Sequence, residues 1–461
     1  MRILITGATG LIGRELGKRL AMRGDALVCL VRDVEAARRS LPFPATLHAW
    51  DHTRAVPAEA LREADAVIHL AGEPVAEGRW TTEKKALILD SRVQGTRRLV
   101  EAVLARGRRL RVFVHGSASG YYGDRGDEPL TAESSKGEGF LADVVEQWEA
   151  ELQPLLEHRP EVRVPVVRTG IVLARDSGAL AEMLPLFRLS AAGRLGSGRQ
   201  WMSWIHRDDI IGLFIHALDS ADTGLLEGTA PRPVTNAEFT TALARALGVI
   251  ENLPAPPPAI RLMFGEKAAI VLGSTRLEPA ATLASGYRFR FSALRDALAD
   301  LLAPLREGTF LRVWEQWVPQ PPQKLWPFFC AARNLESITP PFLRFHVLGQ
   351  SSGEIEAGTL IDYRLKLDGV PIRWQSRIDA WDPPRSFVDL QVKGPYRLWH
   401  HRHDFEPLGE GTLMRDTVRY QLPAGWLGEL AGARKVADYV TRIFDFRARR
   451  IDELFGRLDW R

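Results

Sequence analysis

Cysteine is scarce in this chain of 461 residues, which contains only Cys29 and Cys330. The two fall in different predicted domains, so the sequence argues against a disulfide framework and favours a reducing compartment. Long apolar runs are also missing: no stretch of about 18 uninterrupted apolar residues could span a bilayer. The first residues, MRILITGATG, are typical of a strand rather than a signal peptide. We therefore predict a cytoplasmic protein without a membrane span.

Blocks of like charge are absent as well. The formal net charge of +4 arises from 61 Lys and Arg residues interspersed with 57 Asp and Glu residues. This pattern indicates an ordinary solvated surface, so we predict no nucleic-acid partner. The length allows two domains, each with its own core. The sequence does not indicate an oligomeric state.

The first part of the chain alternates short apolar runs with helical patterns. Strand–helix alternation of this kind is typical of an α/β Rossmann fold, a doubly wound parallel sheet. The predicted strands are Arg2–Thr6, Ala26–Val31, Ala66–Leu70, Arg111–His115 and Val162–Arg168. The predicted helices are Leu11–Met22, Thr82–Ala105 and Gly139–Glu157.

The pattern changes near Pro304–Gly308, which predicts one domain over residues 1–303 and a second over residues 309–461. Apolar and polar side chains then alternate along Thr359–Leu367 and Pro371–Trp381, which indicates an antiparallel sheet with one wet face. Further strands are predicted at Ser386–Lys393, Tyr396–Phe405 and Thr412–Leu422. A long amphipathic helix, about Glu429–Gly456, closes the chain, and a hollow is expected between it and the sheet.

The motif with the most specific chemistry is a glycine-rich turn between the first strand and the first helix. Gly7 permits a tight turn, Gly10 lets the backbone approach a pyrophosphate, and Gly13 lets helix and strand pack closely. The phosphates would meet the amides and the positive dipole end of the helix. We assign the following residues to a dinucleotide: Gly7, Thr9, Gly10, Leu11, Ile12 and Gly13.

Residues after later strands complete the predicted cofactor site. Arg32 ends the second strand, where its guanidinium would pair with a 2′-phosphate, so we predict NADP(H) over NAD(H). Asp51 is placed to hold the adenine amino group. Small residues after the next strand let the backbone pass close to the cofactor, and the last strand adds an arginine. These residues are Leu70, Ala71, Gly72 and Arg168.

Several separated motifs in residues 1–302 resemble the extended short-chain dehydrogenase/reductases. They include HLAGEPVAEGRW, GSASGYYGD, RTGIVLA and GSGRQWMSWIHRDD, together with the glycine turn. More narrowly they are similar to an atypical, NAD-dependent epimerase-like branch that is often labelled cell-division-inhibitor-like. The resemblance implies a nicotinamide cofactor and a small-molecule substrate.

The chain departs from that superfamily at its proton relay. Members carry Tyr-x-x-x-Lys on the helix after the fifth strand, where the ammonium lowers the phenol pKa. Phe140 and Val144 occupy these two positions, and none of the seven tyrosines is followed four residues later by Lys. Ser117 or Ser119 could bind a substrate carbonyl, and Tyr121 or Tyr122 could act as a displaced acid. We assign Ser117 and Tyr122 to catalysis, and to substrate binding Ser119, Tyr121, Arg199 and Gln200.

Residues 309–461 resemble the START/polyketide-cyclase (SRPBCC, helix-grip) superfamily. The resemblance rests on a strand ending near Val318, two short helices, the segment TPPFLRF and the closing helix. It implies a cavity that accepts a hydrophobic ligand. His401 and His403 share one face of a strand there, while His400 points away. No acid or thiol partner is visible in the local pattern, so we predict no metal site.

Two functions follow from these patterns. One is an NADP(H)-dependent oxidoreductase or epimerase-like enzyme with a fused ligand-binding domain. The other is a non-catalytic protein that binds or senses NADP(H), because the Tyr-x-x-x-Lys relay is missing. The sequence names neither the substrate nor the direction of hydride transfer.

Overall fold

The computed structural model describes residues 1–188, 191–221, 224–251, 254–303, 305, 309–423 and 425–455. The chain divides into two compact units, Met1–Val34 with Ala45–Ala303 and Glu35–Pro44 with Pro304–Arg461. The boundary predicted at Pro304–Gly308 lies, apart from Leu305, outside the described residues. Within the described part of the chain, no helix combines the length and the apolar composition needed to cross a membrane. The cellular location stays a prediction.

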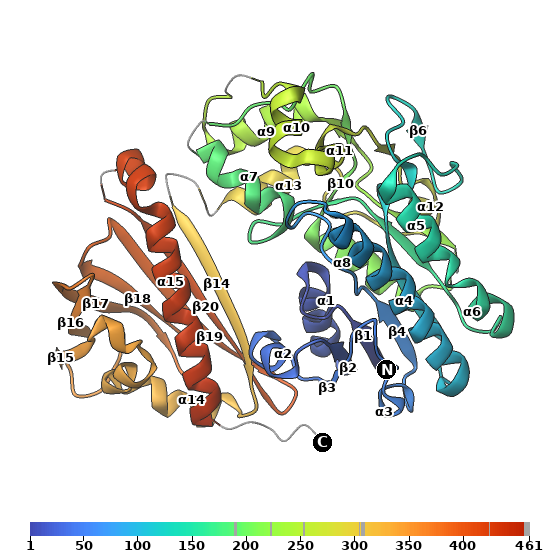
Figure 1. The fold of residues 1–461 in the computed structure, drawn as a ribbon. Helices are drawn as coiled ribbons and strands as arrows, with labels where there is room; N and C mark the ends of the chain where they lie inside the picture. The colour runs from blue at the N-terminus through green and yellow to red at the C-terminus, as the bar shows by residue number, and fades with distance from the viewer. Residues whose placement is uncertain are drawn as a thin grey trace. The chain divides into compact units, whose positions relative to one another are not determined.

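A seven-stranded sheet organises the first unit (Figure 1). Its order is β11-β7-β5-β4-β1-β2-β3 and every pairing is parallel. Most of its side chains are buried, as expected for a parallel sheet covered on both faces. The strands are β1 (Arg2–Thr6), β2 (Ala26–Val31), β3 (Thr46–Ala49), β4 (Ala66–His69), β5 (Val112–Ala118), β7 (Val166–Thr169) and β11 (Leu225–Gly228). The predicted doubly wound parallel sheet is confirmed.

The strand order reverses at β1, which pairs with β2 on one side and β4 on the other. Helix α1 (Leu11–Met22) connects β1 to β2, and α4 (Thr82–Arg106) lies between β4 and β5. Parallel crossovers are right-handed, so these two connections place their helices on opposite faces. Helix α1 packs against α8 (Arg207–Asp219), and α4 packs against α5 (Phe140–Ala150). Ligands bind at the carboxyl ends of the strands beside such a reversal.

Short helices and two-stranded pairs make up the rest of the first unit. The helices are α3 (Ala58–Leu61), α6 (Gln153–His158), α7 (Gly178–Arg188), α9 (Asn236–Leu247), α10 (Pro257–Phe264), α11 (Ala268–Leu272), α12 (Ala280–Ala284) and α13 (Leu294–Leu302). The strands are β6 (Pro129–Leu130), β8 (Ile171–Leu173), β9 (Trp201–Met202), β10 (Trp204–His206), β12 (Val234–Thr235) and β13 (Arg276–Leu277). Helix α2 (Val34–Ser40) follows β2 along the chain.

An antiparallel sheet of seven strands forms the second unit, in the order β14-β20-β19-β18-β17-β16-β15. Figure 1 shows helix α15 (Gly425–Phe455) lying across this sheet. The strands are β14 (Phe310–Val318), β15 (His346–Gln350), β16 (Leu360–Leu367), β17 (Val370–Asp382), β18 (Ser386–Lys393), β19 (Leu398–Leu408) and β20 (Gly411–Gln421), and a short helix is α14 (Pro322–Phe329). The predicted antiparallel sheet is confirmed, whereas its assignment to the helix-grip superfamily stays a prediction.

Prolines account for two differences from the predicted elements. The helix predicted over Gly139–Glu157 is two helices, and Pro154 stands in the first turn of α6, where its missing N–H is tolerated. The strand predicted from Val162 begins at Val166, because Pro165 has no N–H to donate to the ladder. Strand β5 continues to Ala118, so Ser117 lies within the sheet.

Candidate cofactor and catalytic site

The turn between β1 and α1 is built so closely that side chains are excluded from two of its positions. Gly7 has a φ of +71°, and a Cβ there would stand 2.8 Å from the carbonyl carbon and oxygen of Leu70. A Cβ on Gly13 would stand 2.2 Å from the Gly7 oxygen. The Gly10 amide closes the turn by donating to the Gly7 oxygen at 3.0 Å. Gly7 and Gly13 therefore occupy the tight turn and the close helix–strand contact predicted for them, while the role of Gly10 toward a pyrophosphate stays a prediction.

The N-cap of α1 has no side chain that would compete with a ligand for the backbone amides of the first turn. Gly10 is the N-cap and makes no side-chain capping bond, and no acidic residue stands in this turn. Thr9 and Gly10 are exposed, while Leu11 and Ile12 are half-buried. Amides and the positive end of the helix dipole favour an anion at such a terminus. The geometry suits a pyrophosphate.

The segment after β4 is held against the glycine turn by one hydroxyl group. Thr6 Oγ1 accepts hydrogen bonds from the amides of Leu70 and Ala71, both at 3.1 Å, and lies 2.7 Å from His69 Nδ1. Burial lowers the pKa of His69 to about 3, so the ring is neutral. Leu70 and Ala71 thus lie close to the backbone of the turn, while the predicted approach of Leu70, Ala71 and Gly72 to the cofactor stays a prediction.

Arg32 follows β2 at the same edge of the sheet. Its side chain is 80% exposed, and Nη1 lies 3.7 Å from Glu73 Oε2. Glu73 is itself held at 2.6 Å by Lys84 Nζ. The guanidinium is therefore accessible to a phosphate and loosely held by its carboxylate neighbour.

Asp51 lies just beyond β3, in a turn of its own. Its Oδ1 accepts from the Thr53 amide at 2.8 Å and from the Thr53 hydroxyl at 2.5 Å. These hydrogen bonds lower the pKa of Asp51. The carboxylate is thus ionised at neutral pH, and its role toward an adenine amino group stays a prediction.

Glu149 is bonded to two predicted site residues, and one of them, Arg168, extends the network to two tyrosines. It accepts from Ser117 Oγ at 2.5 Å and from Arg168 Nε and Nη2 at 2.9 and 2.7 Å. Arg168 Nη1 donates to Tyr122 Oη at 3.0 Å, and its guanidinium stacks 3.4 Å from the Tyr121 ring centroid. No local sequence signal marks Glu149, because its partners come from β5 and β7.

Tyr122 has a cationic neighbour but no exposed surface. Its side chain is fully buried, and burial raises the pKa of Tyr122 although Arg168 beside it acts to lower it. Burial likewise lowers the pKa of Arg168, but Glu149 and Tyr122 more than compensate and hold it above its usual range. The Arg168 guanidinium thus already bonds to two protein groups, Glu149 and Tyr122. The catalytic and cofactor assignments of these residues stay predictions.

The two positions of α5 that would hold the Tyr and Lys of the relay have apolar residues in apolar surroundings. Phe140 packs edge to face on Trp80 with ring centroids 5.3 Å apart, and Val144 is 2% exposed. The ammonium of Lys85 lies 5.3 Å from the Phe140 ring centroid. A cation thus stands close to this position, but the hydroxyl that it would act on is absent.

The other predicted substrate residues differ in how far they are free to bind. Ser119 and Tyr121 lie half-buried in a short 3-10 helix, Ser119–Tyr122. Arg199 is exposed. Gln200 is buried and donates its amide hydrogens to the carbonyl oxygens of Leu195 and Val271, at 3.0 and 3.2 Å. Its side chain therefore positions a loop in this structure.

A cavity of about 190 Å³ lies within the second unit. Aromatic and aliphatic side chains from the sheet form most of its wall, among them Tyr363, Trp374, Ile378 and Trp399. Leu335 lines it from a segment outside the sheet. The hollow expected between sheet and helix is present.

The first unit is similar to proteins of the epimerase family. The model of the NAD dependent epimerase/dehydratase family matches residues 3–141, and a domain of unknown function (DUF1731) matches residues 255–301. The chain is 35% identical over 312 residues to the "Epimerase family protein SDR39U1 homolog, chloroplastic" of Arabidopsis thaliana, covering 66% of this chain and 87% of that protein.

Solved structures show the same similarity. The human epimerase family protein SDR39U1, crystallised with NADPH, is 32% identical with a TM-score of 0.58, over 66% of this chain and 99% of that one. MoeE5 in complex with UDP-glucuronic acid and NAD is 21% identical with a TM-score of 0.53, over 66% of this chain and 98% of that one. The second likeness shows the fold alone.

Replacing Gly13 by Ala tests the closeness of the glycine turn. The new Cβ would stand 2.2 Å from the Gly7 oxygen, so the turn must shift. We expect at least a tenfold loss of NADPH affinity in a fluorescence titration, and a loss of about 1–3 kcal/mol in the free energy of unfolding. Gly224→Ala is the control, because a Cβ there meets no atom within 4 Å. Unchanged NADPH affinity in Gly13→Ala would contradict this account of the turn.

Proposed function

Because the chain belongs to the NAD dependent epimerase/dehydratase family, we propose that its first unit is an NADP(H)-dependent oxidoreductase or epimerase-like enzyme acting on a small molecule. The observation that carries this proposal is the glycine turn, where Gly7 and Gly13 exclude side chains and no side-chain capping bond is made at the start of α1. The turn lies at the reversal of strand order, where sheets of this kind bind dinucleotides.

The preference for NADP(H) rests on Arg32. An acid at the tip of the second strand would bind the ribose hydroxyls and repel a 2′-phosphate. Here an exposed guanidinium occupies that place, and charge-assisted bonds from Arg to phosphate are strong. The similar human SDR39U1 was crystallised with NADPH.

The chemistry expected at this site divides between cofactor and protein. A bound nicotinamide would accept or donate hydride. The protein must then supply the proton when the substrate is reduced and take it up when the substrate is oxidised. Tyr122 is the proposed acid or base, and Ser117 is proposed to bind the substrate oxygen. Tyr122 has the nearby cation that a phenol needs, in Arg168 rather than in a lysine four residues along the helix. Its burial requires the substrate oxygen to reach the network through Ser117 or through movement of the Ser119–Tyr122 segment.

A non-catalytic role is the second candidate. Phe140 and Val144 remove the usual relay, and the polar atoms of Ser117, Tyr122 and Arg168 already bond to one another or to Glu149. In this case NADP(H) would serve as a bound ligand or a redox signal. The two functions differ in turnover, and this difference can be measured.

The second unit is proposed to bind a hydrophobic ligand in its cavity. An engineered cavity of about 150 Å³ with apolar walls holds one benzene molecule. The cavity of about 190 Å³ therefore suits a ligand with one small aromatic or aliphatic ring system. Trp374 and Trp399 would contact such a ring through their faces or edges.

Removal of the Arg32 guanidinium tests the cofactor preference. In Arg32→Ala we expect NADPH affinity to fall about tenfold or more, because a charge-assisted bond is lost, while NADH affinity stays within twofold. Both are measured by fluorescence titration. Arg109→Ala is the control: this side chain is 61% exposed and precedes β5, at the opposite edge of the sheet. Equal losses for NADPH and NADH would contradict the assignment.

Turnover separates the enzyme from the binding protein. We expect the purified chain to oxidise NADPH with at least one member of a broad carbonyl panel, or to epimerise a sugar nucleotide. Tyr122→Phe should then lower kcat at least a hundredfold while NADPH affinity stays within twofold. Tyr287→Phe serves as control, because it also removes a phenol hydroxyl that donates a hydrogen bond in the first unit, at a residue without an assigned role.

Two results would decide against this assignment. Saturable NADPH binding without any turnover would favour the non-catalytic role. Full turnover in Tyr122→Phe, with a lower melting temperature because Arg168 has lost a buried partner, would assign the hydroxyl a structural role only.

Filling the cavity tests ligand binding by the second unit. Leu335→Trp adds bulk at a partly exposed wall position, so we expect the affinity for 2-aminonaphthalene, a fluorescent probe with one fused ring system, to fall tenfold or more. Leu348→Trp is the control because Leu348 is 55% exposed on β15. Fluorescence of the probe reports both. Equal probe affinity in the two variants would show that the probe binds elsewhere.

A further inference from the structure

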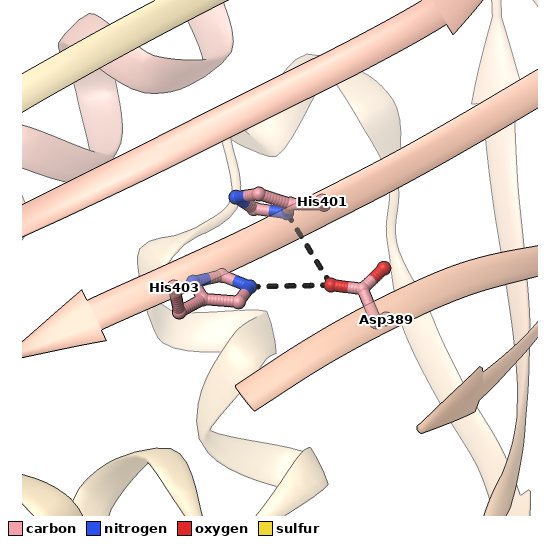
Figure 2. Close-up of side chains that lie close together, drawn as sticks. All are labelled: Asp389, His401 and His403. Carbon is pink, nitrogen blue, oxygen red and sulfur yellow. Dashed lines mark hydrogen bonds and ion pairs between the residues drawn. The ribbon is translucent and has the colours of Figure 1, made fainter. Parts of the chain in front are cut away.

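Two histidines in the cavity wall lie between two carboxylates. His401 and His403 are two residues apart on β19, so their side chains share a face, and their ring centroids are 3.7 Å apart. Asp389 comes from the neighbouring strand β18, and Figure 2 shows it pointing at both rings. Asp416 comes from β20, on the other side of β19. The local sequence around the histidines could not reveal either acid.

The distances indicate where the ring protons lie. Asp416 Oδ1 is 2.6 Å from His403 Nδ1 and 3.1 Å from His401 Nε2. Asp389 Oδ2 is farther from the opposite nitrogens, at 3.2 Å from His403 Nε2 and 3.4 Å from His401 Nδ1. The shorter contacts place both N–H groups toward Asp416. A carboxylate that accepts from the outer nitrogens in this way orients imidazoles in metal sites.

Arg447 completes the arrangement around Asp416. Its Nε lies 3.7 Å from Asp416 Oδ2, and its Nη2 lies 3.3 Å from His403 Nδ1. His403 Nδ1 has one hydrogen-bonding position, so it bonds either to Asp416 or to Arg447, but not to both. The contact with Asp416 is 0.7 Å shorter (3.3 less 2.6 Å), so the nitrogen donates to the carboxylate. Arg447 thereby balances the charge of Asp416.

Three acceptor atoms remain, and they lie close together. With their protons turned to Asp416, His401 Nδ1 and His403 Nε2 present lone pairs toward the Asp389 carboxylate. One ligand atom from each residue can be chosen so that all three lie within 4.8 Å of one another. Lone pairs and a negative charge repel unless a cation lies among them. Ligand atoms about 2.0–2.2 Å from one ion are roughly 3–3.5 Å apart, and Asp389 Oδ2 lies 3.4 and 3.2 Å from the two nitrogens.

We propose that Asp389, His401 and His403 bind one divalent transition-metal ion. Two imidazoles with one carboxylate are the ligand set of mononuclear Fe(II) sites, and closely related sets hold catalytic Zn(II). The two carboxylates and Arg447 give the cluster one net negative charge when the imidazoles are neutral. A divalent ion changes this to one net positive charge.

The remaining coordination positions open into the cavity, because all three ligands line it. A net positive metal beside aromatic walls suits a small apolar or aromatic molecule that carries an anionic oxygen, such as a phenolate, enolate or carboxylate. This ligand class rests on the proposed function of the cavity. The metal site itself does not, so the two can fail separately.

Metal binding by the full, untagged chain after chelation tests the proposal. Calorimetry with Zn²⁺ alone, and with Fe²⁺ under anaerobic conditions, should show one equivalent per chain. His401→Gln, His403→Gln and Asp389→Asn should each weaken binding at least tenfold. His400→Gln is the matched control, since it removes an imidazole from the opposite face of the same strand. Circular dichroism verifies that each variant is folded.

X-ray absorption of the zinc-loaded wild-type chain gives a second measurement that needs no variant. We expect nitrogen and oxygen ligands only, with scattering from two imidazoles. A spectrum without imidazole scattering, or equal affinity in wild type and in folded His401→Gln and His403→Gln, would overturn the proposal. The cluster would then be an ion network closed by a shared proton. Binding of the 2-aminonaphthalene probe, measured in parallel, reports on the cavity independently of the metal.

Discussion

The close approach of three backbone segments at the first glycine turn is the constraint on which the first unit depends. Gly7 has its backbone against Leu70, Gly13 has its Cα against the Gly7 carbonyl, and Thr6 fixes the Leu70 and Ala71 amides. Side chains are kept out, so the amide end of α1 stays open to an anion. The reversal of strand order at β1 then places the ends of β2, β3 and β4 around the same opening.

A second feature distinguishes this chain from enzymes with a Tyr-x-x-x-Lys relay. The apolar side chains of Phe140 and Val144 take the relay positions, and the polar groups nearby form a closed network centred on Glu149. In that network the cation beside the phenol of Tyr122 comes from β7 rather than from α5. The Tyr122 hydroxyl beside this cation can hold a proton, but it is buried in the protein. Catalysis at this site therefore depends on whether a substrate can reach the Tyr122 hydroxyl.

The sequence predicted the limits of those helices and strands that are bounded by clear turn signals. The strands β1, β2 and β18 and the helix α1 have the predicted limits, since each is an apolar run or an amphipathic segment between clear turn signals. The limits near Pro154 and Pro165 differ because one proline starts a helix and the other delays a strand.

Partners that are distant in sequence could not be predicted. Glu149 meets Ser117 and Arg168, and Asp389 and Asp416 meet the histidines of β19, only because the sheets bring their strands together. Periodicity reports which face a side chain occupies, but it does not report which side chain of another strand lies beside it.

Calorimetric titration of the wild-type chain with NADPH tests the central claim most directly. If the amides of α1 bind a pyrophosphate, one equivalent of NADPH should saturate the chain, and excess pyrophosphate should weaken its binding by competition. Heat that does not saturate, or no heat at all, would contradict the assignment of the glycine turn to a dinucleotide.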